Sequence, residues 1–139
     1  MENLDHSSKE VESSEALYYS VNHIWISVDE TLLTLGVTHL VPNKLGEILF
    51  FDAPEEGDRI VRDNSFGSLE SITDWMALVA PVSGLIVELN PNIIEQPFIL
   101  NDDPYEGGWI LRVEIESEKE LVDLIRAAQY KMLSIKRLN

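Results

Sequence analysis

The chain has 139 residues, no cysteine and a formal net charge of −15, which fits one acidic domain and excludes disulfides, thiol catalysis and thiolate metal sites. Residues 17–116 carry 17 acids against four bases, so the body repels phosphate, and nucleic acid and anionic membranes are poor partners. This charge serves solubility or steers the protein toward a basic partner surface. No apolar run approaches the roughly 20 residues that cross a bilayer, and the N-terminus does not resemble a signal peptide, so we expect a cytoplasmic protein.

Residues 1–16 are rich in serine and glutamate and almost free of apolar side chains. Such a composition cannot form a packed core, so it predicts a disordered or loosely attached acidic tail. A single domain is expected over residues 17–139.

Short strands dominate the domain. Residues 24–28 and 33–37 alternate between core-type and solvent-type positions around a break at Asp29-Glu30, which predicts a hairpin. The apolar run 48–51 predicts a strand buried on both faces, and the alternation over 109–115 predicts a strand with one wet face. Many short strands with frequent turn signals indicate a sandwich or small barrel. The turn signals are Pro54–Gly57, Asp63-Asn64, Ser83-Gly84, Asn90-Pro91-Asn92, Asp102-Asp103-Pro104 and Gly107-Gly108.

Two segments favour helix. Thr38–Val41 could begin a helical turn, which we expect Pro42 to keep short or to restart at Asn43. Ser117 and Glu120 fit a capping box, which starts a C-terminal helix. Its apolar face has the helical period and comprises Leu121, Leu124, Ile125, Ala128 and Met132.

A weak internal echo links two segments about 38 residues apart, Gly46–Phe51 and Gly84–Leu89. Each places a glycine before a buried strand. The echo indicates a pseudo-symmetric sandwich or arises by chance.

Several motifs occur in a fixed order between Tyr19 and Tyr130. Together they resemble the H-protein family of the glycine cleavage system. The motifs are His23-Ile24-Trp25, Gly36-Val37-Thr38, Leu45-Gly46-Glu47, Pro54-Glu55-Glu56-Gly57, Glu70-Ser71, Ala80–Gly84, Leu100–Tyr105 and Gly107-Gly108-Trp109.

The resemblance implies a mostly β, lipoyl-domain-like fold, also called a barrel-sandwich hybrid. It comprises two antiparallel sheets related by a pseudo-twofold axis, with a C-terminal α-helix. The resemblance also implies a carrier rather than an enzyme. In this family a lysine at a hairpin tip bears lipoate, which holds an aminomethyl group between the P, T and L proteins of glycine cleavage.

The attachment motif departs from the family at one position. The family has Glu-Ser-Val-Lys-Ala, whereas residues 70–74 read Glu-Ser-Ile-Thr-Asp, and the spacing to Ala80-Pro81 is kept. Lipoylation forms an amide with a primary amine, which the hydroxyl of Thr73 cannot supply. The nearest lysines, Lys44 and Lys119, lie outside this hairpin. The sequence therefore predicts a protein without lipoate.

The residues around Thr73 are the candidate partner contacts. Trp75 and Met76 either pack onto the sheet as core or form an exposed apolar knob that docks into a partner groove. Glu70 and Ser71 are remnants of recognition or part of the hairpin's structure, and we favour structure. The candidate contacts are Glu70, Ser71, Ile72, Thr73, Trp75 and Met76.

No catalytic or metal-binding constellation is found in the sequence. The three histidines lack metal-ligand spacing, and there is no nucleophile elbow or phosphate-binding loop. We expect a non-catalytic, non-lipoylated adaptor paralogue that contacts the P, T or L proteins or lipoate-attaching enzymes. The alternative is an H-protein carrier that uses an unrecognised attachment or acts beside a lipoylated paralogue. An independent enzyme has no support.

Overall fold

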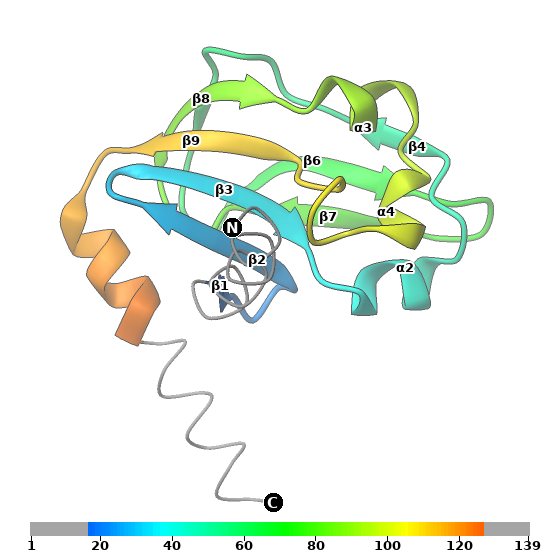
Figure 1. Ribbon diagram of the computed structural model, residues 1–139, viewed down its shortest axis with the longest axis horizontal. Coiled ribbons are helices and arrows are strands. Elements are labelled where there is room, and N and C mark those ends of the chain that lie inside the picture. The colour runs from blue at the N-terminus through cyan, green and yellow to red at the C-terminus, as the bar shows by residue number, and fades with distance from the viewer. Residues whose placement is uncertain (1–16, 127–139) are drawn as a thin grey trace, which may run out of the picture.

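The computed structural model describes residues 17–126, which form two antiparallel β-sheets around a common interior (Figure 1). The predicted acidic tail, residues 1–16, lies outside the described residues, as do Ala128 and Met132 of the expected helix face. Within the described part of the chain, no helix is both long and apolar enough to span a membrane.

The larger sheet has six strands in the order β1-β2-β3-β9-β8-β5, and the smaller sheet has three in the order β4-β6-β7. The larger sheet comprises β1 (Leu17–Tyr19), β2 (Ile24–Asp29), β3 (Leu32–Val37), β9 (Leu111–Ile115), β8 (Gly84–Leu89) and β5 (Arg59–Ile60). The smaller sheet comprises β4 (Phe50–Asp52), β6 (Ser65–Glu70) and β7 (Trp75–Val79). The predicted mostly β fold with two antiparallel sheets is confirmed.

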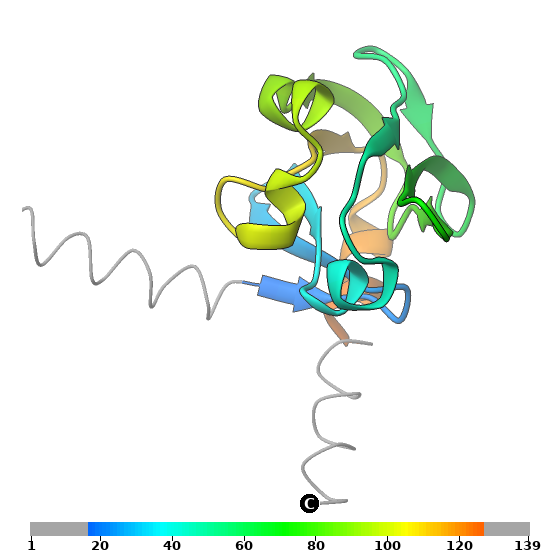
Figure 2. The same cartoon turned by 90° about the vertical axis from the view of Figure 1, so that its right-hand side faces the viewer.

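Three short helices, α2 (Leu40–Leu45), α3 (Pro91–Glu95) and α4 (Ile99–Asp102), lie at one end of the molecule and face the viewer in Figure 2. The loop between β6 and β7 lies at this same end, whereas helical residues 118–126 lie at the opposite end (Figures 1 and 2). The hairpin tip and the C-terminal helix are therefore far apart.

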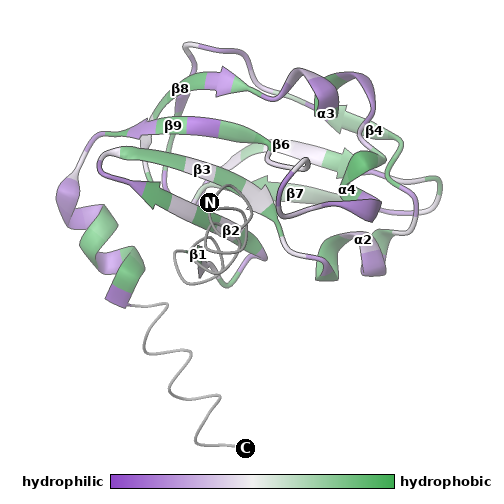
Figure 3. Cartoon of the chain, in the orientation of Figure 1, coloured by the Kyte–Doolittle hydropathy of each residue, from purple (hydrophilic) through white to green (hydrophobic). Residues whose placement is uncertain are grey.

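The core lies between the two sheets and is closed by the short helices. Hydrophobic and hydrophilic residues both occur along β8 and β9 (Figure 3), as expected for strands with one buried and one wet face. The large side chains that are fully buried in this core are Ile24, Ile26, Leu33, Leu35, Ile48, Leu69, Leu78, Ile86, Ile93, Leu100, Ile110 and Leu111.

The predicted hairpin is β2–β3, in which Asp29 pairs with Leu32 and Glu30 takes a positive φ of 58° in the turn. Trp25 is buried although it lies on the opposite face from Ile24 and Ile26. Its indole lies against Gly36, where an added Cβ would come within 2.4 Å of the ring. The indole Nε1 donates a hydrogen bond to the Pro104 carbonyl at 2.9 Å, so the buried polar atom is satisfied.

The prediction for residues 48–51 is wrong in part. Ile48 is buried ahead of the strand, but β4 begins at Phe50, whose side chain is 62% exposed. Among the described strands, β4 is an edge strand of the small sheet and pairs with β6. The glycines of the internal echo also differ, because Gly84 is the first residue of β8 and Gly46 ends α2 with a φ of 85°. The pseudo-twofold symmetry stays a prediction.

The short helix expected near Pro42 is confirmed as the six residues of α2, but the helix does not restart at Asn43. Pro42 does not interrupt it, because it is the third helical residue, where its missing N–H would have no partner within the helix. Asn90-Pro91-Asn92 begins α3 rather than a simple turn. The Asn90 side chain accepts the N–H of Asn92 at 3.0 Å, and Pro91 occupies the first helical position.

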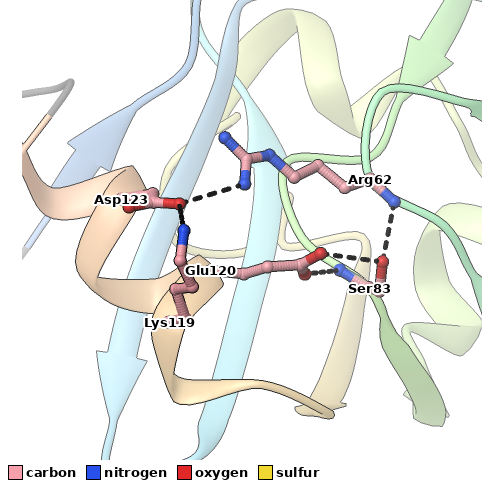
Figure 4. Close-up of polar contacts among 5 residues, drawn as sticks. All are labelled: Arg62, Ser83, Lys119, Glu120 and Asp123. Atoms are coloured by element: carbon pink, nitrogen blue, oxygen red, sulfur yellow. Dashed lines mark hydrogen bonds and ion pairs between the residues drawn. The ribbon is translucent and has the colours of Figure 1, made fainter.

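The C-terminal helix is present, but Glu120 does not act as the capping box predicts. Its carboxylate instead accepts the backbone N–H of Ser83 at 2.7 Å (Figure 4). Leu124 is buried on this helix, and Leu121 packs against the core. The predicted apolar face therefore meets the sheet over the described part of the helix.

Candidate functional site

The candidate site is the β6–β7 hairpin, whose loop is closed by its first and last residues. The N–H of Ser71 donates to the Asp74 carbonyl at 2.9 Å. The Ser71 hydroxyl accepts the Asp74 N–H at 3.2 Å, and the Asp74 carboxylate accepts the N–H of Trp75 at 2.8 Å. These side chains satisfy backbone groups in a turn, as serine and aspartate commonly do. Ser71 thus contributes to the hairpin's structure.

The two residues at the apex, Ile72 and Thr73, project into solvent. Ile72 is 85% exposed and Thr73 is also exposed. The apex presents a hydroxyl and an aliphatic group but no amine, so position 73 does not fit an amide-linked lipoyl group. Lys44 lies on α2 and Lys119 on the C-terminal helix, so neither described lysine belongs to this loop.

The register of the small sheet separates the two residues of the expected apolar knob. Met76 pairs with Leu69 and packs against the core, whereas Trp75 pairs with Glu70 on the outer face and is 64% exposed. Consecutive strand residues point to opposite faces, and in this sheet the inner face of β7 meets the core while the outer face at Trp75 is open to solvent. Met76 is therefore part of the core, whereas Trp75 is exposed, so each of the two alternatives holds for one residue.

The structure adds Phe50 to the site. Phe50 pairs with Glu70 from the other side, so Phe50, Glu70 and Trp75 form one row across β4, β6 and β7. We call this the outer row. Phe50 could not be identified from the sequence pattern, because the apolar run 48–51 predicts a strand buried on both faces. Only the pairing between β4 and β6, which are distant in sequence, shows which way Phe50 points.

A shallow groove of about 540 Å³ adjoins the outer row on the same face. Its floor includes the next outward-facing row, Asp52, Ser68 and Ala77, which are cross-strand partners. Trp75 forms part of the wall. The groove is lined by Asp52, Ala53, Ser65, Phe66, Gly67, Ser68, Trp75 and Ala77.

Other parts of the described chain show no competing chemistry. Residues 17–126 contain no group of three or more histidine, aspartate or glutamate side chains that could hold a metal ion. His39 Nδ1 lies 2.7 Å from the hydroxyl of Tyr105, which also accepts the His39 backbone N–H. Burial raises the pKa of Tyr19, and Tyr105 adds to this shift. The hydrogen bonds join the start of α2 to the segment after α4, and these groups do not form a catalytic arrangement.

Comparison with known proteins identifies the family. The family model described as glycine cleavage H-protein matches residues 17–136. A glycine cleavage system H protein of Staphylococcus carnosus is 41% identical over 117 residues, which cover 84% of this chain and 93% of that protein. The Carboxydothermus hydrogenoformans H protein is 43% identical over 117 residues and covers 84% and 90%.

A solved structure agrees with the sequence comparisons. The crystal structure of a glycine cleavage system H protein from Mycobacterium marinum superimposes with a TM-score of 0.70 at 30% identity, covering 73% of this chain and 85% of that chain. The lipoyl-domain-like fold implied by the sequence motifs is therefore confirmed.

The prediction that lipoate is absent is corrected by these matches. The matched family is lipoate-bearing, and the misfit described above concerns one position, Thr73. A threonine at that position is no ground for calling the protein cofactor-free.

The segment matched by the family model includes all of the described residues, and the relatives are matched over most of their own length. The proteins of this family are carriers within the glycine cleavage system and are not themselves catalytic, as the sequence analysis expected. The chain therefore belongs to the glycine cleavage H-protein family.

Proposed function

We propose that this protein acts as an adaptor subunit, which docks onto protein partners of glycine cleavage through the β6–β7 hairpin. The proposal is supported by two exposed apolar side chains on a hairpin whose loop is closed by hydrogen bonds. Its loop is closed by Ser71 and Asp74, while Ile72 and Trp75 hold large apolar surfaces in solvent beside the exposed Glu70. Exposed apolar groups on a rigid support are typical of interface anchors.

The P, T and L proteins are the first partners to test, followed by lipoate-attaching enzymes. In this role the chain occupies the position of a lipoyl-bearing H protein on one of these partners. The two apex residues, Ile72 and Thr73, are uncharged, and the body around them is acidic. This combination suits a docking surface that takes no part in the reaction.

The test is a reconstituted glycine decarboxylation assay with P, T and L proteins and a lipoylated H protein of the source organism. Adding this chain in excess should lower the rate, because the adaptor competes for the H-protein position. The double variant Ile72→Ser with Trp75→Ala should lose this effect, while Val87→Ala, an exposed aliphatic change on β8, should keep it. An unchanged rate with the wild-type chain would overturn the adaptor role.

A carrier role is the second candidate, and the lipoate-bearing character of the family favours it. A carrier through another attachment site would restore activity when the lipoylated H protein is left out of the assay. Intact mass of the protein purified from its source, with peptide mapping of any lipoyl increment, would locate the attachment. Activity that appears only beside a lipoylated paralogue would instead indicate a cooperating subunit.

A further inference from the structure

The outer row places two aromatic side chains on either side of one carboxylate. Phe50 and Trp75 are the direct cross-strand partners of Glu70 on β4 and β7. Neighbouring strands lie about 4.8 Å apart, and opposed side chains of such a pair stand on the same face. The carboxylate of Glu70 is therefore flanked by a ring on each side, and both rings are mostly exposed.

No basic side chain of the described chain neutralises this carboxylate. The ion pairs among residues 17–126 join Arg59 to Glu116, Arg62 and Lys119 to Asp123, and Arg112 to Glu88. Residues 63–111 contain no lysine or arginine at all. The small sheet and its tip loop add two more carboxylates, Asp52 and Asp74. This face thus has a negative charge beside exposed apolar rings.

The same combination of groups occurs elsewhere in the molecule with its cation in place. On the larger sheet, the guanidinium of Arg112 lies 3.9 Å from the ring centroid of Trp109 and pairs with Glu88 at 2.6 Å. An arginine satisfies both partners there, because its planar cation stacks on an aromatic face while its N–H groups bind the carboxylate. The outer row offers the aromatic and acidic partners without the arginine.

We propose that the outer row is a docking site for an arginine side chain of a basic protein partner, with the guanidinium on Glu70 between Phe50 and Trp75. The adjoining groove over Asp52, Ser68 and Ala77 then takes the segment that carries this arginine. Charge complementarity identifies the occupant, since an acidic face repels a second copy of this acidic chain. The inference rests on the proposed docking function and specifies the chemistry of its partner.

The primary experiment measures binding of the full chain to purified P, T and L proteins by titration calorimetry at low and high salt. Phe50→Ala, Trp75→Ala and Glu70→Gln should each weaken the complex about tenfold, since a desolvated cation–π or charge-assisted contact has this magnitude. Glu70→Gln should also reduce the salt dependence. The matched controls are Phe98→Ala, an exposed phenylalanine beside α4, and Glu118→Gln on the C-terminal helix. Both should bind as the wild type does.

The two proposals fail in different ways. If a partner binds the wild type and the three outer-row variants equally, the outer row is not the docking site although the adaptor role stands. If none of the three proteins binds the wild type, the adaptor role on these partners fails, and the outer row is then tested by itself. In that test, N-acetyl-arginine amide should shift the indole N–H resonance of Trp75, whereas the neutral isostere N-acetyl-citrulline amide should not. Equal shifts with both would overturn the arginine site.

Discussion

The carboxylate of Glu120 accepts the backbone N–H of Ser83, joining the C-terminal helix to the loop between β7 and β8 across 37 residues of sequence (Figure 4). The Ser83 hydroxyl in turn accepts the backbone N–H of Arg62 at 3.0 Å. Three segments that are far apart in the chain therefore share one small polar network. The helix is held against the sheet by these bonds as well as by Leu124.

Replacing Glu120 with alanine should loosen the helix from the sheet. The variant leaves the Ser83 N–H without its charged acceptor, and such bonds contribute about 1.5–3 kcal/mol. We expect the free energy of unfolding, measured by urea denaturation, to fall by about that amount. Glu118→Ala, two residues earlier and exposed, should change the free energy of unfolding by about 0.5 kcal/mol or less. Equal effects of the two variants would contradict the anchoring role of Glu120.

A fall in pH should weaken another contact of the same helix, the ion pair between Asp123 and Arg62 of the β5–β6 loop. The hydrogen bond from Lys119, with a further contribution from Arg62, holds the pKa of Asp123 below its ordinary value. A lowered carboxyl pKa stabilises the fold above the pKa of the unfolded chain, and this stabilisation is lost as the pH falls through the lowered pKa.

The measurement compares the wild type with Asp123→Asn across a pH series. The wild type should be the more stable protein near neutral pH, and the difference should shrink below about pH 4, where aspartate in an unfolded chain takes up its proton. Added salt should also shrink it, because these side chains are partly exposed. A difference that is constant with pH would show that the Asp123 pairs do not contribute.

The opposite orientations of Trp75 and Met76 have opposite consequences for stability. Trp75→Ala should change the free energy of unfolding by less than about 1 kcal/mol, because its side chain is mostly in solvent. Leu69→Ala, at the buried cross-strand partner of Met76, should lower it by about 2–5 kcal/mol. The loss of unfolding free energy in Met76→Ala should lie between the losses in these two variants. A large loss for Trp75→Ala in denaturant titrations would mean that the indole packs on the molecule.

Gly84 should resist substitution because of a close approach between strands. A Cβ at this position would lie 2.3 Å from the backbone carbonyl oxygen of Glu114, and backbone cannot move aside as a side chain can. Gly84→Ala should therefore disturb the β8–β9 pairing and lower the melting temperature. Gly107→Ala is the comparison, since its Cβ would meet only the exposed Asp103 carboxylate, which can shift at the cost of its hydrogen bonds to the N–H groups of Glu106 and Gly107. A fall in melting temperature in Gly107→Ala as large as that in Gly84→Ala would contradict this explanation.

Much of the fold follows from local patterns in the sequence. The alternation over 24–28 and 33–37 gives β2 and β3, and the helical period after Ser117 gives the C-terminal helix. The short helices α3 and α4 were not predicted, since helices of four or five residues have too little periodicity and depend on contacts made by the whole fold. The partner of Glu120 is likewise set by tertiary structure.

The candidate site was predictable in part. The position of the hairpin came from the motif order, and the inward side of β7 has its own signal, because Met76, Leu78 and Ala80 recur at every second residue. The outward side of the small sheet could not be predicted, because it depends on the register of β4 against β6. Disorder of residues 1–16 and cytoplasmic localisation stay predictions.

The closure of the tip loop by Ser71 and Asp74 makes the hairpin's shape independent of the two residues between them. Neither Ile72 nor Thr73 supplies a side-chain hydrogen bond to this closure among the described residues. Substitutions at the apex should therefore change the surface offered to other molecules while leaving the closure of the loop intact. In this chain, residue 73 sets the chemistry of the apex, while the residues on either side of the apex set its shape.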